Sequence, residues 1–458
     1  MMNNMLDNTF LSYDDPVYEN KIKHDGFWAA LLLGMLFFGP RSTPTMSLPP
    51  FRVVDFIIVY LFFSRLYLGR YQNGFIFSSA NKVFSILMLL LTFVLVISTF
   101  INVAIGKIPF FLKDFNLAVS FVRAVVIASV ASSFVWKDKQ VRQFAFWIMS
   151  WVFLAGLLAF VQKFFPYMAS GIIEKLYAVE YTRLEIETSS IYSRVAGTFG
   201  NPNMFGYGLV FLGTTSLTSA IYLKGRYRFW HIVLYLFIGF AVLITTGSRT
   251  SLGAFVIVTF MVLIMSLKGN SKIGILFVMF MVIVLYFLVK VNIHSLPLNE
   301  RVKDVLAGQE GAVEEGIYSR YALWEKSFEA AKESIVFGEG ASRITFQLSD
   351  NGYIMMLLRT GIIGAILYLS LLIYLIIIGV SSCLNETRQL QKAIVYMGVA
   401  ALVNHLIFEL TADFLWNVEL VAIWAAYMGI LCGISYQRKQ YHFYSYCNGN
   451  DLNTLNIE

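Results

Sequence analysis

The sequence predicts an all-α polytopic membrane protein with about twelve transmembrane helices. Of its 458 residues, 58% are hydrophobic and only 14% are charged, and the mean hydropathy is +0.67. A membrane helix needs roughly 20 mostly apolar residues, and twelve segments approach or exceed this length. These segments are 26–39, 53–68, 83–105, 115–136, 143–165, 204–223, 229–246, 250–267, 272–291, 352–381, 391–411 and 414–435.

The distribution of basic residues predicts the orientation of these spans. With an even number of spans both termini share one side, and most Lys and Arg of the tails and short loops lie on that side. Because basic loops stay in the cytoplasm, we expect a cytoplasmic tail at 1–25, a transmembrane domain at 26–435 and a disordered cytoplasmic tail at 436–458. The net charge of +7 then follows from topology, and no nucleic-acid partner is expected.

Two long loops, 166–203 and 292–351, interrupt the short connections, and both fall on the outer side. Long loops often carry function. Within the second, the segment 318–334 has large or apolar residues at helical spacing with charges between them, which predicts an amphipathic helix at the membrane surface. The residues with this spacing are Tyr321, Trp324, Phe328 and Ala331.

The first long loop ends in the stretch YSRVAGTFGNPNMFGYG, 192–208, whose composition favours the binding of an anion. Glycines permit close backbone approach, the following helix presents free N–H groups, and Arg194 can grip phosphate oxygens. Alternatively, Asn-Pro-Asn is only a turn and helix cap. Asn201 and Asn203 are therefore candidates for acceptor contacts or for a structural role.

Two more arginines lie in outer loops. Arg249 occurs in the short loop TTGSRTS, where the charge bias predicts none, and Arg320 opens the amphipathic segment. The simpler interpretations are an arginine that snorkels to lipid headgroups and a solvated surface charge, respectively.

A further arginine, Arg359, lies nine residues after Asp350, which is about 13 Å deeper if the segment is helical. A buried arginine needs a partner or a cavity. Candidate partners recur every fourth residue on one face of the eleventh span, and they suggest a structural ion pair, a proton relay or an acceptor-sugar contact. These are His405, Glu409 and Asp413. No second His or Cys cluster completes a metal site, so neither a metal nor another cofactor is expected.

Together, these sequence motifs resemble those of the membrane-embedded O-antigen polymerase and ligase family, which comprises Wzy-type polymerases and ligases. The resemblance covers roughly residues 190 to 375. Its motifs are Arg194 with GTFGNPN at 197–203, GSR at 247–249, the Arg320 helix with FGEG at 337–340, and Asp350-Asn351 followed by GIIG at 361–364. We expect the GIIG glycines to allow close helix packing.

The resemblance implies a glycosyltransferase of the GT-C-like architecture in a bacterial inner membrane, with its two large loops in the periplasm. It implies lipid-linked glycans on undecaprenyl diphosphate as substrates, membrane lipid around the spans, and a possible protein that regulates chain length. Ligases of the family typically carry a histidine where this chain has Asp350. This departure favours a polymerase of O-antigen, capsule or exopolysaccharide repeat units.

The chemistry also follows from elementary requirements. Sugar transfer from a lipid diphosphate needs cations for the leaving group and a base for the attacking hydroxyl. We therefore assign Arg194, Arg249 and Arg320 to the diphosphate and propose Asp350 as the base or acceptor-positioning group, oriented by Asn351. Asp350 could instead cap the following helix.

Two alternatives remain for the chain as a whole. One is a ligase that passes the glycan to lipid A core. The other is a non-enzymatic flippase, whose charged groups should lie near the midplane of the membrane.

Overall fold

The computed structural model describes residues 22–39, 53–69, 79–109, 115–165, 195–199, 201–267, 312–341, 351–412, 415 and 417–453. These residues form an all-α structure. Its helices are α2 (Asp25–Phe38), α3 (Val53–Gly69), α4 (Ser79–Ala104), α5 (Phe115–Ser132), α6 (Asp138–Phe164), α9 (Pro202–Tyr222), α10 (Arg226–Ala241), α11 (Arg249–Leu267), α14 (Ala312–Lys332), α15 (Gly352–Asn385), α16 (Gln389–Glu409) and α17 (Val418–Asn453).

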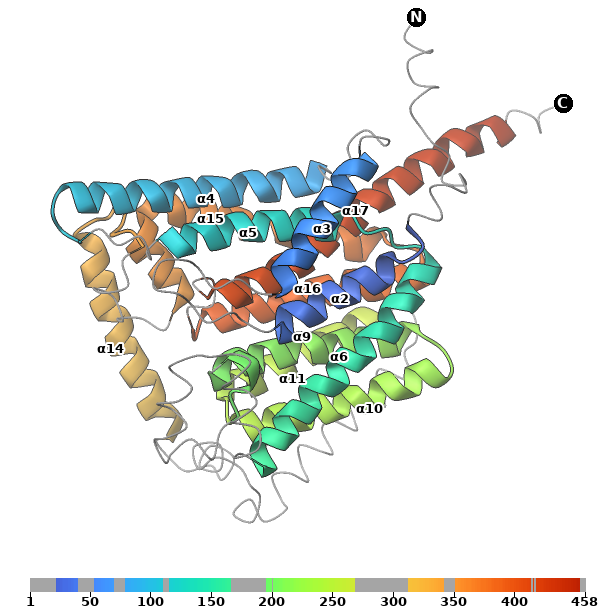
Figure 1. Cartoon of the computed structure of the whole chain (residues 1–458), viewed down its shortest axis with the longest axis horizontal. Coiled ribbons are helices and arrows are strands. Elements are labelled where there is room, and N and C mark those ends of the chain that lie inside the picture. Colours follow the sequence, from blue (N-terminus) through green and yellow to red (C-terminus); the bar gives the residue numbers. More distant parts are fainter. Residues whose placement is uncertain are drawn as a thin grey trace, which may run out of the picture.

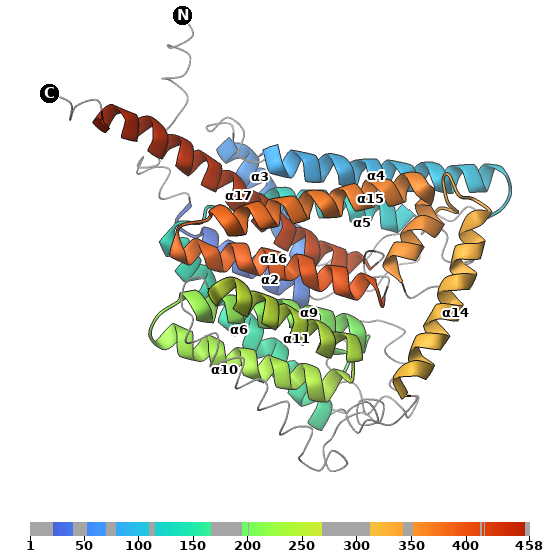
Figure 2. The ribbon, with the colours of Figure 1, turned by 180° about the vertical axis from the view of Figure 1, so that it is seen from behind.

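The long helices form a bundle, and α14 lies across one end of it (Figure 1). We call this end the α14 end. The view from behind shows the same arrangement, with the C-terminal part of α17 projecting beyond the opposite end (Figure 2). Side chains 205–220 of α9 and 420–435 of α17 are almost all buried, so these two helices supply the centre of the bundle.

Eleven of the twelve predicted spans are helices, and the twelfth, 272–291, lies outside the described residues. Within the described part, seven helices are long and apolar enough to cross a membrane, and Asp25–Phe38 and Thr250–Ser266 are shorter apolar helices. The chain is therefore a polytopic membrane protein, while the total of twelve spans stays a prediction. The predicted amphipathic segment corresponds to α14, which begins and ends slightly earlier than expected.

The helix α5 ends at Ser132, four residues before the predicted end of its span. The apolar residues that follow are buried but not helical, because side chains of distant helices bind their backbone. Val135 N–H donates to Asp25 Oδ2 at 2.9 Å, and Trp136 N–H donates to Gln437 Oε1 at 3.1 Å. Hydropathy alone cannot detect this exchange of hydrogen-bond partners.

The helix α17 differs from expectation at both ends. It begins at Val418, after the predicted start at 414, because Asn417 accepts hydrogen bonds from Glu419 N–H at 3.0 Å and Leu420 N–H at 3.2 Å. It continues to Asn453, so the prediction of a disordered tail from 436 is wrong for residues 436–453. Polar composition predicted disorder, but these residues include no proline that would end a helix already started in the core.

Two arginines inside the described spans form ion pairs with aspartates of neighbouring helices. Arg65 of α3 donates to both carboxylate oxygens of Asp25, at 2.5 and 3.2 Å, and both side chains are buried. Arg123 of α5 lies 2.6 Å from Asp55 of α3. Burying one of these charges alone would be costly, so the pairs fix α3 against its neighbours.

The helix α15 is broken at Gly361, which has φ +64° and ψ −167°. A break withdraws the usual N–H donors from the carbonyl groups one turn earlier. The turn 335–341, which we call the FGEG turn, replaces them. Glu339 N–H donates to Leu358 O at 2.8 Å, and Gly340 N–H donates to Arg359 O at 2.9 Å. The expectation that GIIG only allows close helix packing is therefore incomplete.

The FGEG turn is also fixed to the end of α4. The turn also accepts a hydrogen bond from α15, because Ile362 N–H donates to Ile335 O at 2.8 Å. Polar side chains of α4 bind its backbone at three points. Ser98 Oγ donates to Phe337 O, Asn102 Nδ2 donates to Gly338 O at 2.9 Å, and Thr99 Oγ1 accepts from Ala341 N–H at 3.0 Å. The turn thus joins α14, α15 and α4.

We predict that Gly338→Ala destabilises the protein by about 2 kcal/mol or more, because it combines steric overlap with a left-handed backbone. Gly338 has φ +70°, and an added Cβ would lie 2.4 Å from Gly361 N. The matched control is Gly253→Ala in α11, where nothing lies within 4 Å of the added Cβ. Thermal unfolding of the purified variants in detergent checks this, and equal midpoints for both variants would contradict it.

Candidate active site

The predicted site residues come from segments that meet at the α14 end of the bundle. There α9, α11, α15 and α17 begin, while α4 and α16 end (Figures 1 and 2). Arg249 is the first residue of α11, and Arg320 lies in α14. Arg194, Asp350 and Asp413 lie outside the described residues.

The segments that carry two of the predicted arginines are in direct contact. Val195, the neighbour of Arg194 in sequence, donates its N–H to Thr245 O at 2.6 Å. One turn into α9, Gly206 packs so closely against α11 that an added Cβ would lie 1.9 Å from Ser251 Oγ. The GTFGNPN segment and the GSR segment therefore lie side by side.

Asn201 caps α9. Its side-chain oxygen accepts hydrogen bonds from Asn203 N–H at 2.8 Å and Met204 N–H at 3.4 Å, and Pro202 follows as the first helical residue. The interpretation of Asn-Pro-Asn as a turn and cap is therefore confirmed for Asn201. A sugar contact by Asn203 stays a prediction.

Asn351, rather than Asp350, is the residue that caps α15. Its oxygen accepts from Tyr353 N–H at 3.0 Å and Ile354 N–H at 3.1 Å, while its amide nitrogen donates to Leu410 O at 3.3 Å. Both ends of the amide thus hold the start of α15 against the end of α16. Asn351 directly follows Asp350 in the sequence. The cap therefore fixes the end of the segment that carries this carboxylate.

A buried cluster surrounds His405. The hydroxyl groups of Tyr207 and Tyr368 lie 3.0 Å from its Nδ1 and Nε2, and its ring stacks on Trp424 with centroids 4.6 Å apart. Glu409 Oε1 lies 3.7 Å from Nε2. The cluster thus draws from α9, α15, α16 and α17. Because both ring nitrogens have partners, these contacts favour the structural interpretation of His405.

Glu409 lies between this cluster and the start of α15. Its Oε1 accepts from Leu415 N–H at 2.7 Å, and a Cβ added to Gly352 would lie 1.3 Å from its Oε2. The carboxylate therefore fixes the connection between α16 and α17 beside the α15 cap. Arg359 is also buried, at 5% exposed, and its pairing with the His405 and Glu409 stripe stays a prediction.

Sequence reasoning missed Glu339, in the middle of the FGEG turn. Its side chain is only 6% exposed, and its buried Oε2 accepts no hydrogen bond from the described residues. Burial raises the pKa of this carboxyl to about 7, while Lys107 opposes the rise and Glu333 adds to it. The only sequence signal is a carboxylate between two glycines, and both glycines have positive φ here.

The pKa of Glu339 predicts a pH-dependent stability. Between pH 4.5 and about 7 the folded state binds the extra proton, so stability falls as the pH rises through this window. Glu339→Gln removes the cost of the buried charge. We therefore expect it to stabilise the protein at pH 8 by a few kcal/mol, on the order of 3, but not at pH 4.5.

Thermal unfolding of the purified protein at the two pH values measures this difference. Glu325→Gln serves as the control, because Glu325 is exposed on α14, and it should leave the pH dependence unchanged. An equal effect of Glu339→Gln at both pH values would contradict the account.

Among the residues described, no group of three or more His, Cys, Asp and Glu side chains is placed to hold a metal ion. The described polar groups at the α14 end include amides, hydroxyls and carboxylates, and three arginines are predicted from the same segments. Such a set suits the binding of an anion and proton transfer to a carboxylate.

Comparison with known protein families agrees with the resemblance seen in the sequence. Residues 234–369 match the family described as O-Antigen ligase, Wzy_C, which includes Wzy polymerases and WaaL ligases. The reaction type of this family is glycosyl transfer of lipid-linked glycans. The matched segment contains GSR, α14, the FGEG turn and Asn351, whereas GTFGNPN at 197–203 precedes it. A comparison with curated proteins found no match.

Proposed function

We propose that this chain, whose residues 234–369 match the O-antigen ligase family, is a polymerase of repeat units carried on undecaprenyl diphosphate. The observation that carries the proposal is Asp350. It directly precedes the α15 cap inside the matched segment, at the place where ligases of the family typically carry histidine. The product would be an O-antigen, capsule or exopolysaccharide chain.

The diphosphate of the donor binds to Arg194, Arg249 and Arg320 in this proposal. The contact of Val195 with Thr245 supports it for the first two, because it brings their segments together. Arg249 also begins α11, where the helix dipole favours an anion. Three guanidinium groups at the leaving group would stabilise the charge that develops as the glycosidic bond breaks.

The transfer itself exchanges one bond for another. The acceptor hydroxyl of a second repeat unit attacks the anomeric carbon and gives its proton to the base. The bond from that carbon to the diphosphate oxygen breaks, and undecaprenyl diphosphate leaves with the bonding electrons. We assign Asp350 as the base or acceptor-positioning group and Asn351 as the residue that positions it.

Glu339 is a second candidate for the base. A general base works best when its pKa is near the working pH, and burial raises the pKa of Glu339 to about 7. The FGEG turn is hydrogen-bonded to α15 at Leu358 and Arg359, about two helical turns after Asn351. The variants Asp350→Asn and Glu339→Gln therefore distinguish the two candidates, because only loss of the true base should abolish transfer.

We place the reaction at the outer face of a bacterial inner membrane, with both termini cytoplasmic. The concentration of basic residues on the terminal side supports this orientation. The α14 end then faces the periplasm, where lipid-linked repeat units and a chain-length regulator would meet it. No metal ion takes part in the proposed step, so transfer should continue in the presence of a chelator.

Glycan ladder analysis in a strain that lacks this protein tests the proposal. Wild type should restore the ladder of chain lengths. Arg194→Ala, Arg249→Ala and Asp350→Asn, at normal protein levels, should each reduce polymerised glycan by about 100-fold, since loss of one group that stabilises a transition state costs roughly 10² to 10³ in rate. The control is Arg226→Ala at the start of α10, which should restore the ladder fully.

The second candidate is a ligase that transfers finished chains to lipid A core, which the description of the matched family favours. Deletion would then leave long chains on undecaprenyl diphosphate, whereas loss of a polymerase leaves single repeat units on the core. Full activity of Asp350→Asn would show that the assignment of Asp350 as the base is wrong.

A further inference from the structure

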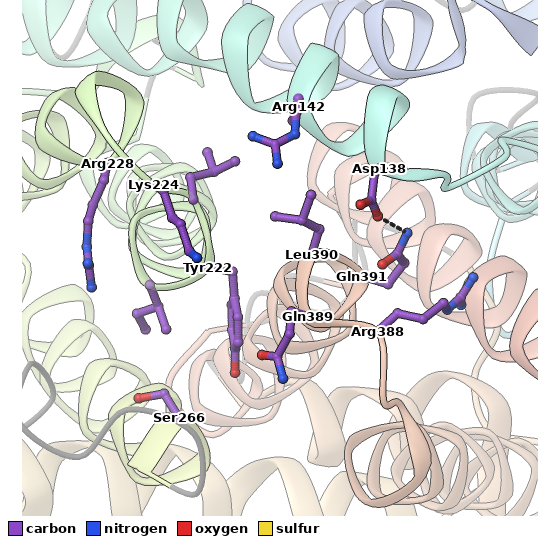
Figure 3. A pocket seen from close by; sticks show the side chains of 12 residues that line it. Asp138, Arg142, Tyr222, Lys224, Arg228, Ser266, Arg388, Gln389, Leu390 and Gln391 are labelled. Atoms are coloured by element: carbon purple, nitrogen blue, oxygen red, sulfur yellow. Dashed lines mark hydrogen bonds between the residues drawn. The ribbon is translucent and has the colours of Figure 1, made fainter.

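A basic pocket lies at the end of the bundle opposite α14, away from the proposed active site. It encloses about 630 Å³ between the starts of α6, α10 and α16 and the ends of α9 and α11. This volume lies within the range of roughly 300 to 1,000 Å³ that is typical of ligand sites. Figure 3 shows Arg142, Lys224 and Arg228 around the space, with Asp138 beside Gln391.

The charges of this pocket are unbalanced. Arg388 is neutralised by Glu386, whose carboxylate accepts from its Nε at 2.9 Å and from its Nη2 at 2.8 Å. Within the described part of the chain, Arg142, Lys224 and Arg228 form no ion pair.

The one carboxylate in the pocket lining, Asp138, accepts a hydrogen bond from Gln391 Nε2 at 3.0 Å. Three cations from α6, the α9–α10 connection and α10 therefore share one cavity with a single carboxylate.

The remaining lining suits a ligand with both polar and apolar parts. Gln389 offers an amide group and Ile221 and Leu390 supply apolar walls, while the Ser266 hydroxyl donates to Leu263 O at 2.6 Å. Hydrogen-bond donors among cations are the usual means of holding phosphate oxygens. A free inorganic anion would make no favourable contact with the apolar walls.

Exposed aromatic residues place this pocket at the level of the membrane surface. Tyr227 and Trp230 of α10 are each 45% exposed, and Phe146 and Trp147 of α6 are 46% and 39% exposed. The rings of Phe146 and Tyr227 are in contact, with centroids 6.2 Å apart. Aromatic side chains gather where membrane meets water, and Arg142 and Arg228 lie on the same two helices beside them.

We propose that this pocket binds the phosphate headgroup of an anionic membrane lipid. The phosphate lies among Arg142, Lys224 and Arg228, and the acyl chains run along the apolar surface of the neighbouring helices. Basic pockets between membrane helices recognise lipid headgroups by this combination of cations and adjacent hydrocarbon. The site is independent of the proposed glycosyl transfer, because its residues lie at the other end of the bundle.

Native mass spectrometry of the purified full-length protein tests this proposal with phosphatidylglycerol as the anionic probe and phosphatidylcholine as the neutral one. The double substitution Arg142→Ala with Lys224→Ala should weaken phosphatidylglycerol binding by about 30-fold and leave phosphatidylcholine binding unchanged. This factor combines the usual contributions of two basic residues near an anionic surface. The matched control is Lys139→Ala with Arg226→Ala, which removes two exposed cations at the starts of α6 and α10 outside the pocket.

Two further measurements keep the test decisive. Lys224→Arg should retain binding, and an unchanged unfolding midpoint of the double variant would show that the loss is not caused by misfolding. Equal phosphatidylglycerol binding by wild type and double variant would overturn the proposal. It would also be overturned if inorganic phosphate bound the pocket as tightly as the lipid, because the ligand would then be a soluble anion.

Discussion

The structure at the α14 end depends on the backbone hydrogen bonds that fill the break in α15. Within a membrane protein every buried N–H and C=O group needs a partner, and a broken helix persists only where protein replaces the lost bonds. The FGEG turn supplies two donors and one acceptor to the break at Gly361. Because the turn follows α14 directly, the same bonds fix α14 across the bundle and bury Glu339.

Polar groups at the α14 end divide into those that build the scaffold and those left for chemistry. The amides of Asn201 and Asn351 cap α9 and α15, and His405 joins four helices through two tyrosines and a tryptophan. These residues have their hydrogen bonds within the protein. The groups proposed for catalysis lie on segments that this scaffold holds, which is the arrangement a preorganised site requires.

Sequence alone predicted the helices of eleven spans and most of α14, because hydrophobic length and helical spacing are local signals. It could not predict that Gly361 breaks α15, since this depends on a turn more than twenty residues earlier in the chain. The pairing of Arg65 with Asp25 and the burial of Glu339 likewise depend on contacts between distant helices. The proposed roles of Arg194, Arg249, Arg320 and Asp350 rest on the family resemblance.

The central claim is that the chain polymerises lipid-linked repeat units, and reconstitution tests it most directly. Purified protein in vesicles is incubated with undecaprenyl diphosphate carrying one repeat unit, in the presence of a chelator, and the lipid products are measured by mass spectrometry. The account predicts lipids that carry two or more repeats, with none formed by Asp350→Asn or Arg249→Ala. Unchanged single-repeat lipid with active wild-type protein, or transfer only to added lipid A core, would contradict it.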